Sequence, residues 1–538
     1  MFQSLIIISL LSLGVANYSF NHYDSLTEIK ELRETYSVSY LTPRGTRLSF
    51  YYGTPVHYLD SDGNYQPIDA SFKQNNSRFV TKANSNNIIV ENGYIRVNDD
   101  ICIDCFEKNC SVLDNCIYCE DCLIESLAAG VLMKKPIYFD DTISQTYSFS
   151  FLLLNNLDIK SHDSNLLISN LYKISSPILV GLNSSLAVCP SSFSLSKDGN
   201  RVSLHYTFQL DENTNQEFNL LQQLTYTNYS GSSYIQHKYF QMGYSSTYSS
   251  SLLVGSSPLL DPYGNTPEYR IAFGLSLPEM PLCNNTLSGS LFFKKQSGAL
   301  SNVRLRRAHN ITYSNINGTS TYSVSNIATI SLGSDYASVD ITRKLIDVYN
   351  ENSSSLNIIV SEVGSNATCY IYTNYSSYAP YFAIEFGGYG NTQNYFDAPP
   401  NVNCCGYALW LPSGFNFSAT FDTQYTLTEH DVNESMMYVF YLYQNYFDIV
   451  DVFAIESCYT IIPSTHRRIA FRIKIDASGG YDGDYHFMWQ TSSGSWAEKI
   501  GKETNSAYGE HLSTNYPSFD SSWGVYNSNT YYYAIWTE

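Results

Sequence analysis

Apolar and polar residues alternate over short stretches through most of residues 37–386, and turn-forming Gly, Asn, Asp and Ser separate these stretches. The stretches are rich in Tyr, Ile, Val, Thr and Phe, which is the pattern of half-buried β-strands. Residues 56–60 and 65–69 flank an Asp62-Gly63 turn, and this arrangement predicts a β-hairpin. We therefore expect a mainly β protein.

The pattern changes after Phe386. Residues 387–400 contain Gly387-Gly388, Gly390 and a final Pro399-Pro400, a composition typical of a linker. Further on, residues 428–443 join a helix-start signal to an apolar stretch, and strands are predicted at 469–476 and in a hairpin over 486–499. A helix followed by an antiparallel sheet is an α+β arrangement. The predicted order is a β-rich module at 17–230, a second at 231–386, a linker at 387–400 and an α+β domain at 401–538.

The first sixteen residues resemble a targeting segment. Leu5 to Leu13 is an apolar core, and the small residues Gly14-Val15-Ala16 follow it, which predicts a signal peptide over residues 1–16. This core is too short to span a membrane, which takes about 20 apolar residues. We expect a secreted protein, extracellular or at the cell surface, with no transmembrane segment. Asn-x-Ser/Thr sequences such as those at Asn183 and Asn374 are consistent with a glycoprotein.

The charge balance excludes one class of partner. The chain of 538 residues holds 49 acidic and 30 basic residues, for a net charge of −19. Such a chain repels phosphate backbones, so we expect no nucleic-acid partner. No Gly-rich phosphate loop follows a predicted strand, and we expect no cofactor. The small basic group His466-Arg467-Arg468 is expected on a solvated strand face.

Six of the twelve cysteines lie within residues 102–122. Their Cys-x-x-Cys spacings would fit zinc or an iron–sulfur cluster in a reducing compartment. Behind a signal peptide, the same even number favours three disulfides, and this is our expectation, with no metal and with the pairing left open. The six are Cys102, Cys105, Cys110, Cys116, Cys119 and Cys122.

The candidate catalytic residues lie after the predicted linker. Asn403-Cys404-Cys405-Gly406 opens a predicted short helix, and the positive end of a helix favours a thiolate while its first N–H groups can face an oxyanion. His486 follows on a predicted strand and can act as a base for such a thiol. From residue types alone, Cys404 and Cys405 as half-cystines and His486 as an exposed strand residue are the simpler interpretation.

A resemblance favours the catalytic interpretation. Asn403-Cys404-Cys405-Gly406-Tyr407-Ala408-Leu409, His486-Phe487-Met488-Trp489-Gln490 and Trp496-Ala497-Glu498-Lys499-Ile500-Gly501 resemble, in order, motifs of secreted papain-like cysteine peptidases and amidases. The resemblance covers about the last 140 residues and implies a papain-like α+β domain, with Cys404 as nucleophile and His486 as base. Cys405 stands where that family has an aromatic residue, so which thiol reacts stays open.

The other predicted site residues are expected to act with Cys404 and His486. Gln490 lies four residues beyond His486, so it shares a strand face with His486, and it is the predicted orienting residue; a cross-strand hydrogen bond is its alternative role. Asn403, Cys405 and Gly406 are the candidates for contacts with the substrate and the oxyanion.

The upstream modules also resemble known domains. Segments 243–248, 252–255, 269–273 and 339–342 resemble a DNRLRE-type β-sandwich, and residues 54–69 resemble a β-module of wall-associated proteins. Together the resemblances imply a secreted cysteine hydrolase that cleaves a peptide or amide bond, with a microbial cell-wall peptide as the expected substrate. The alternative is a non-catalytic adhesion or carbohydrate-binding glycoprotein.

Overall fold

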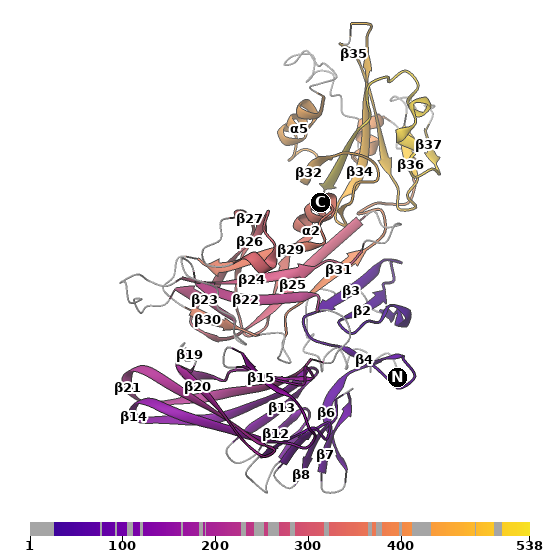
Figure 1. Ribbon diagram of the computed structural model, residues 1–538. Coiled ribbons are helices and arrows are strands. Elements are labelled where there is room, and N and C mark those ends of the chain that lie inside the picture. The colour runs from indigo at the N-terminus through magenta and orange to yellow at the C-terminus, as the bar shows by residue number, and fades with distance from the viewer. Residues whose placement is uncertain are drawn as a thin grey trace.

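The computed structural model shows three β-rich regions, which lie one above another from the bottom to the top of Figure 1. The protein is mainly β, as predicted. The signal-peptide prediction falls outside the described residues. The structure describes residues 26–75, 78–84, 86–91, 94–104, 111–118, 122–162, 165–181, 187–188, 190–227, 233–241, 252–256, 268–279, 286–316, 322–363, 368–372, 379–397, 401–411, 432–478, 480–499 and 508–537.

The N-terminal sheet comprises β6–β21. Its longest members, β14 and β21, pair antiparallel along most of their length, because alternate residues such as Phe149 and Leu204 are buried on one face. Its strands are β6 (Asp69–Asn75), β7 (Arg78–Ala83), β8 (Ile88–Glu91), β9 (Tyr94–Val97), β10 (Ile101–Asp104), β11 (Ser111–Leu113), β12 (Cys116–Tyr118), β13 (Leu123–Leu127), β14 (Gly130–Leu153), β15 (Ile159–His162), β16 (Asn165–Ile168), β17 (Tyr172–Ile174), β18 (Ile178–Gly181), β19 (Ala187–Val188), β20 (Ser192–Asp198) and β21 (Arg201–Tyr226).

The central sheet draws strands from distant parts of the sequence. Helix α2 (Thr342–Asn350) packs on it through Leu345 and Ile346. Its strands are β1 (Thr27–Glu28), β2 (Ser37–Leu41), β3 (Arg47–Tyr52), β22 (Ile235–Gln241), β23 (Leu252–Ser256), β24 (Glu268–Ser276), β25 (Thr286–Gly298), β26 (Asn302–His309), β27 (Ser323–Ser331), β28 (Tyr336–Asp340), β29 (Ser355–Glu362), β30 (Thr368–Ile371), β31 (Tyr381–Phe386) and β33 (Ile462–Pro463).

This sheet changes the predicted boundaries. The module expected at 17–230 is not one unit, because β1–β3 belong to the central sheet, where β3 pairs with β31. The buried rings of Phe50 and Tyr52 pack against Tyr381, so aromatic burial favours this distant pairing. The predicted hairpin is confirmed: β4 (His57–Leu59) pairs with β5 (Tyr65–Pro67), and Gly63 adopts φ +78° in the turn.

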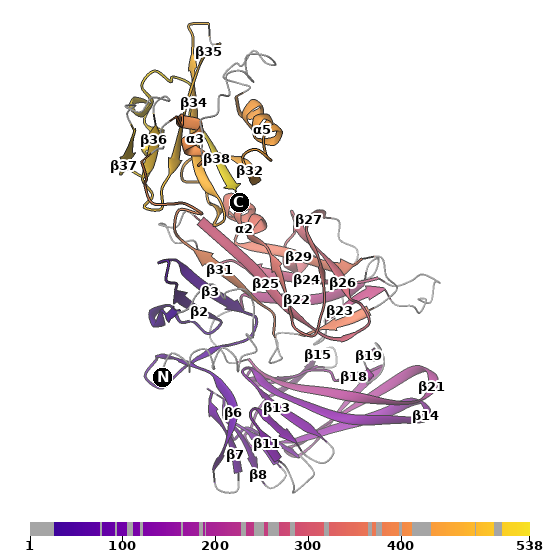
Figure 2. The same ribbon diagram turned by 180° about the vertical axis from the view of Figure 1, so that it is seen from behind.

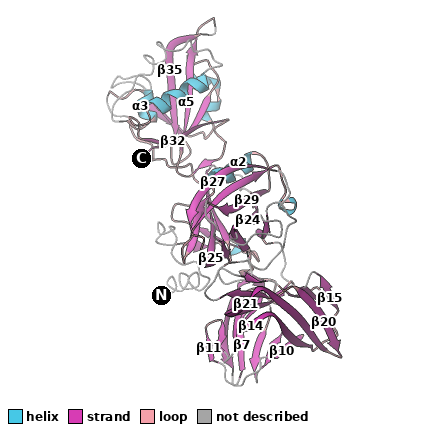
Figure 3. Ribbon diagram, turned by 90° about the vertical axis from the view of Figure 1, so that its left-hand side faces the viewer, coloured by secondary structure: helices cyan, strands magenta, loops and turns pink. Residues whose placement is uncertain are grey.

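The C-terminal sheet is antiparallel, with strand order β32-β38-β34-β35-β36-β37. Helices α3 (Cys404–Ala408) and α5 (Val432–Leu442) share one apolar core with it, and Figure 3 shows both across the sheet. The predicted strand and hairpin are confirmed; the predicted helix start at 428–431 lies outside the described residues. The strands are β32 (Ile449–Ile455), β34 (Arg467–Ile475), β35 (Tyr481–Gln490), β36 (Trp496–Lys499), β37 (Tyr508–His511) and β38 (Tyr531–Thr537).

The segment expected to be a linker is packed against the C-terminal sheet over residues 387–397. The Asn391 N–H donates to the His466 carbonyl at 2.9 Å. The Phe396 ring lies 5.6 Å from that of Trp489. We call residues 387–397 the arm. Its glycines permit positive φ and close backbone approach, so residues 387–397 pack against the C-terminal sheet, whereas composition predicted a linker.

The central and C-terminal sheets are joined directly. Strand β33 pairs in parallel with β25, and the Ser464 N–H donates to the Leu287 carbonyl at 3.0 Å. The guanidinium of Arg343 on α2 lies 3.6 Å from the centre of the Phe453 ring and 3.7 Å from the Asp451 carboxylate. The part of the chain that the structure describes has no helix with the length and apolar character needed to cross a membrane.

Candidate active site

Helix α3 begins with a polar cap. Asn403 has extended backbone angles, and its side-chain oxygen accepts the Gly406 N–H at 2.9 Å. Asparagine stabilises a helix N-terminus in this way because it supplies an acceptor to a first-turn amide. The cap places Cys404 at the first helical position, where α3 packs against β35 and β36 (Figure 2).

Cys404 and Cys405 occupy different environments. Cys405 is fully buried in the apolar core, and burial raises its thiol pKa well above the usual value. Cys404 exposes 6% of its surface. Its thiol donates to the carbonyl of Tyr485 at 3.7 Å, and Cys404 raises the pKa of the adjacent His486. Both are free thiols. The geometry therefore distinguishes the two cysteines, and Cys404 is the thiol beside a base.

His486 is held on several sides. Its Nε2 donates to Glu498 Oε2 at 2.6 Å, which leaves Nδ1 as the nitrogen for the Cys404 thiol. The Tyr526 ring stacks on the imidazole with centroids 5.2 Å apart, and Trp523 meets it edge-on at 5.9 Å. This packing fixes the plane of the imidazole.

The charge state of His486 follows from the same contacts. Burial alone would lower its pKa, because a buried imidazolium loses hydration. The hydrogen bonds and charges of Cys404 and Glu498 outweigh burial and raise the pKa of His486 to about 9. At neutral pH the site therefore favours the imidazolium form of His486.

Glu498 completes a chain of three side chains. Burial alone would raise its carboxyl pKa, but hydrogen bonds from His486 and His511 outweigh burial and lower that pKa. Strand pairing explains the arrangement. Met488 pairs with Glu498 across β35 and β36, so His486 is the diagonal neighbour of Glu498 on the same face.

Glu498 and His511 were not among the residues predicted from sequence. Glu498 lies within the Trp496–Lys499 motif, two residues beyond Trp496, so strand alternation puts both on one face. The usable signal was a carboxylate on the strand that the predicted hairpin pairs with the strand of His486. Finding it required the register of that hairpin.

Gln490 has its alternative predicted role, a cross-strand hydrogen bond, and not the orienting role. Its Nε2 donates to the Gly494 carbonyl at 3.1 Å, and its Oε1 accepts from Arg468 Nη1 at 3.1 Å. Both of its amide atoms therefore support the β35–β36 turn and the buried Arg468. The orienting partner of His486 in the described structure is Glu498, whose carboxylate lies on the adjacent strand.

The residues predicted to contact the oxyanion also have other roles in the structure. The Gly406 N–H and the Asn403 side-chain oxygen bind each other, so this amide is committed to the helix cap. Cys405 points into the apolar core. The Cys404 backbone N–H is a first-turn amide without an intrahelical acceptor, and it stays the candidate donor.

The predicted disulfide cluster is only partly described. Cys102 lies on β10, Cys116 on β12, and Cys122 directly before β13. Cys116 is a free thiol that donates to Asn115 Oδ1 at 3.6 Å, so its predicted disulfide is not formed. Cys105, Cys110 and Cys119 fall outside the described residues, so the other disulfides stay a prediction. Within the described part, no group of three His, Cys, Asp or Glu side chains is placed to hold a metal ion.

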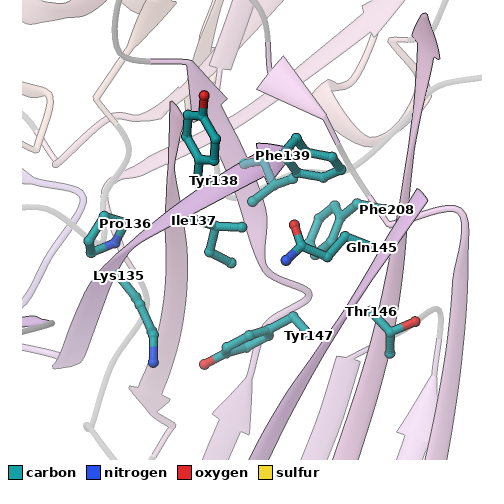
Figure 4. Close-up of a pocket in the computed structure, with 10 residues that line it drawn as sticks. Lys135, Pro136, Ile137, Tyr138, Phe139, Gln145, Thr146, Tyr147 and Phe208 are labelled. Atoms are coloured by element: carbon teal, nitrogen blue, oxygen red, sulfur yellow. The ribbon is translucent and has the colours of Figure 1, made fainter. Parts of the chain in front are cut away.

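A cavity of about 270 Å³ lies on the N-terminal sheet, far along the chain from Cys404 (Figure 4). Phe139, Leu179 and Phe208 are buried in its wall. Tyr138 is exposed at its edge. The side-chain oxygen of Gln145 is buried there and has no hydrogen-bond partner among the described residues.

Comparisons with known proteins assign this chain to no family. No protein-family model matches the sequence, and no curated protein matches it. Among solved structures, "Structure of PNGF-II in C2 space group" aligns with 68% of this chain and 93% of its own, at 8% identity and a TM-score of 0.12.

Proposed function

We propose that this protein is a secreted cysteine hydrolase that cleaves a peptide or amide bond, with a papain-like C-terminal domain. The supporting observation is the placement of His486 between two groups: Glu498 binds its Nε2 at 2.6 Å, and Cys404, whose thiol binds the carbonyl of the adjacent Tyr485 at 3.7 Å, raises its pKa. A thiol, an imidazole and a carboxylate in this order are the groups that nucleophilic acyl transfer requires.

In the proposed reaction the Cys404 sulfur, with its proton on His486, attacks the substrate carbonyl carbon. The C–N bond then breaks, the leaving amine takes the proton from His486, and the acyl group stays on sulfur as a thioester. Water next attacks the thioester while His486 takes one of its protons, which releases the acid and restores the thiol. The Cys404 N–H donates to the transient oxyanion.

Thiol labelling tests this function directly. The full chain is treated with iodoacetamide at neutral pH, and adducts are located by mass spectrometry. We expect Cys404 to react faster than free cysteine and to lose this advantage in His486→Ala. A disulfide at Cys404 in the isolated protein would contradict the proposal.

The substrate class rests on the resemblance of the upstream modules to wall-associated domains. It is tested by digesting peptidoglycan with the wild type and with Cys404→Ala, and reading the products by mass. Wild-type-only products with a new amine and a new carboxyl group are expected. Turnover of synthetic peptides without any wall product would leave a hydrolase of different specificity.

A second candidate function belongs to the N-terminal sheet, where the cavity of Figure 4 suits a ligand. A buried carbonyl oxygen without a partner costs about 1–3 kcal/mol, which a ligand donor would offset. The volume of about 270 Å³ exceeds the roughly 150 Å³ of a benzene-binding cavity, so one substituted ring fits. Aromatic walls beside the buried Gln145 oxygen suit a sugar ring bearing an N–H or O–H donor.

The test for this second function is ligand-observed NMR with N-acetylglucosamine. Gln145→Ala should abolish saturation transfer to the sugar, whereas Tyr118→Ala, an exposed tyrosine elsewhere on the same sheet, should leave it unchanged. Equal transfer in all three proteins would exclude this cavity as the binding site.

A further inference from the structure

Glu498 binds two histidines. Its Oε2 accepts from His486 Nε2 at 2.6 Å, and its Oε1 accepts from His511 Nε2 at 2.7 Å. An ionised carboxylate only accepts hydrogen bonds, so both imidazoles are donors. Each oxygen thus has its own partner, and together they define the plane of the carboxylate.

We propose that His511 is a positioning residue of this site. By holding the outer oxygen of Glu498, it fixes the orientation in which the inner oxygen binds His486 and directs that ring toward Cys404. The proposal rests on the proposed function of Cys404 and His486, and it adds a fourth side chain that does not touch the reacting atoms.

The surroundings of His511 suit this role. Across β36 and β37, Trp496 pairs with His511, so His511 is the second diagonal neighbour of Glu498 on the same face. The His511 ring stacks on Tyr516 with centroids 3.7 Å apart and planes 5° apart. Its side chain exposes 28% of its surface, against 12% for Glu498, so His511 is the outermost member of the series.

The charged and titratable groups around His511 are few. Glu498 on β36 and Tyr516 on the turn 516–518 face its ring. Glu510 precedes it on β37 and accepts from the Ser493 hydroxyl at 3.1 Å instead. The contact of His511 with a charged group in the described structure is therefore the one to Glu498.

Loss of His511 would leave Glu498 Oε1 without this donor, on a side chain that exposes 12% of its surface. The carboxylate would then rotate toward water and weaken its hold on His486. At metal sites, removing the outer partner of a ligand typically lowers activity about 10–100-fold, and we take this as the scale for His511. Substrate affinity should not change, since His511 lies behind Glu498.

The experiment compares four full-length proteins: wild type, His511→Ala, His511→Gln and Leu512→Ala. Leu512 is the adjacent residue and is 81% exposed, so its variant controls for changes in this loop. The readouts are the pH profile of iodoacetamide alkylation at Cys404, and kcat and KM on a cleaved substrate.

We expect His511→Ala to slow alkylation and lower kcat about tenfold at constant KM. His511→Gln, which retains a donor, should recover most of both, and Leu512→Ala should match the wild type. Equal rates in wild type and His511→Ala would overturn the role of His511. Equal losses in the Ala and Gln variants would also overturn it, because they would indicate a need for ring packing and not for the hydrogen bond.

The two proposals fail separately. If Cys404 of the wild type reacts no faster than free cysteine, the proposed function fails and His511 has nothing to position. If Cys404 reacts fast in every variant, the proposed function stands and only the role of His511 is lost.

Discussion

Glu498 and His486 are diagonal neighbours on adjacent antiparallel strands, and the imidazole donates to the carboxylate at 2.6 Å. Both side chains are largely buried, so water competes little for this contact. A buried hydrogen bond between charged groups is stronger than one at the surface. This pair therefore supports the charge that His486 carries beside Cys404.

Replacing Glu498 by Gln keeps the shape of the side chain and removes its charge. We expect kcat/KM to fall about 10–100-fold, because His486 loses the partner that orients and charges it. Steady-state kinetics on a cleaved peptide provides the measurement. The matched control is Glu510→Gln on β37, whose carboxylate binds Ser493 and not a histidine. Equal activity of the two variants would contradict the role of Glu498.

The pH dependence follows from the raised pKa of His486, about 9. Because this pKa is raised, the stabilisation that the His486 imidazolium gains in the site is fully present below the ordinary pKa near 6.5. It is lost as the imidazolium gives up its proton and the pH rises through about 9. The alkaline limb of kcat/KM should therefore lie near pH 9. Glu498→Gln removes one cause of the raised pKa, so its alkaline limb should move to lower pH. An unmoved limb would show that His486 does not set it.

The two adjacent cysteines should respond differently to the same change. Cys404→Ser should abolish thiol chemistry with little loss of stability, because this side chain lies at the edge of the core. Cys405→Ser places a hydroxyl in a fully buried apolar site, which costs about 1–3 kcal/mol without a partner. It should lower the melting temperature and leave Cys404 reactive. Loss of Cys404 alkylation in folded Cys405→Ser would reverse the assignment.

Local sequence signals predicted the β-rich character, the β4–β5 hairpin and the β35–β36 hairpin, since each depends on residues close in the chain. Pairing between strands that lie far apart in the chain leaves no signal in the local sequence. Pairing of β3 with β31 joins segments more than 300 residues apart, so the predicted module boundary was wrong. A different limit hid Glu498: local signals predicted the β35–β36 hairpin but not its register, which puts Glu498 beside His486.

Arg467 and Arg468 show a second limit of prediction from sequence, which concerns burial. Their charges predict a solvated strand face, yet both are fully buried. The Arg467 guanidinium lies 3.9 Å from the centre of the Trp410 ring, and Arg468 donates to Gln490 and to the Thr460 carbonyl. Stacking and carbonyl acceptors offset the loss of hydration, and neither can be read from a single strand. The same buried arginine gives Gln490 the cross-strand hydrogen bond that was its alternative role, in place of the orienting role.

A substitution in the arm tests whether its packing stabilises the C-terminal core. Gly390 adopts φ +98°, and a Cβ there would lie 1.8 Å from the His466 carbonyl oxygen. Gly390→Ala should therefore displace the arm, which carries Phe396 against Trp489, and destabilise the core by more than about 2 kcal/mol.

Gly388→Ala is the matched control for this change. Gly388 also has positive φ, +75°, but its Cβ would meet only a methyl group of Thr46 at 3.6 Å. That variant should cost about 1–2 kcal/mol from backbone strain alone. Alkylation of the buried Cys405 thiol under native conditions reports opening of this core, so Gly390→Ala should label Cys405 faster than Gly388→Ala does. Equal labelling would mean that the arm can leave without opening the core, and that its close approach to His466 does not hold the domain together.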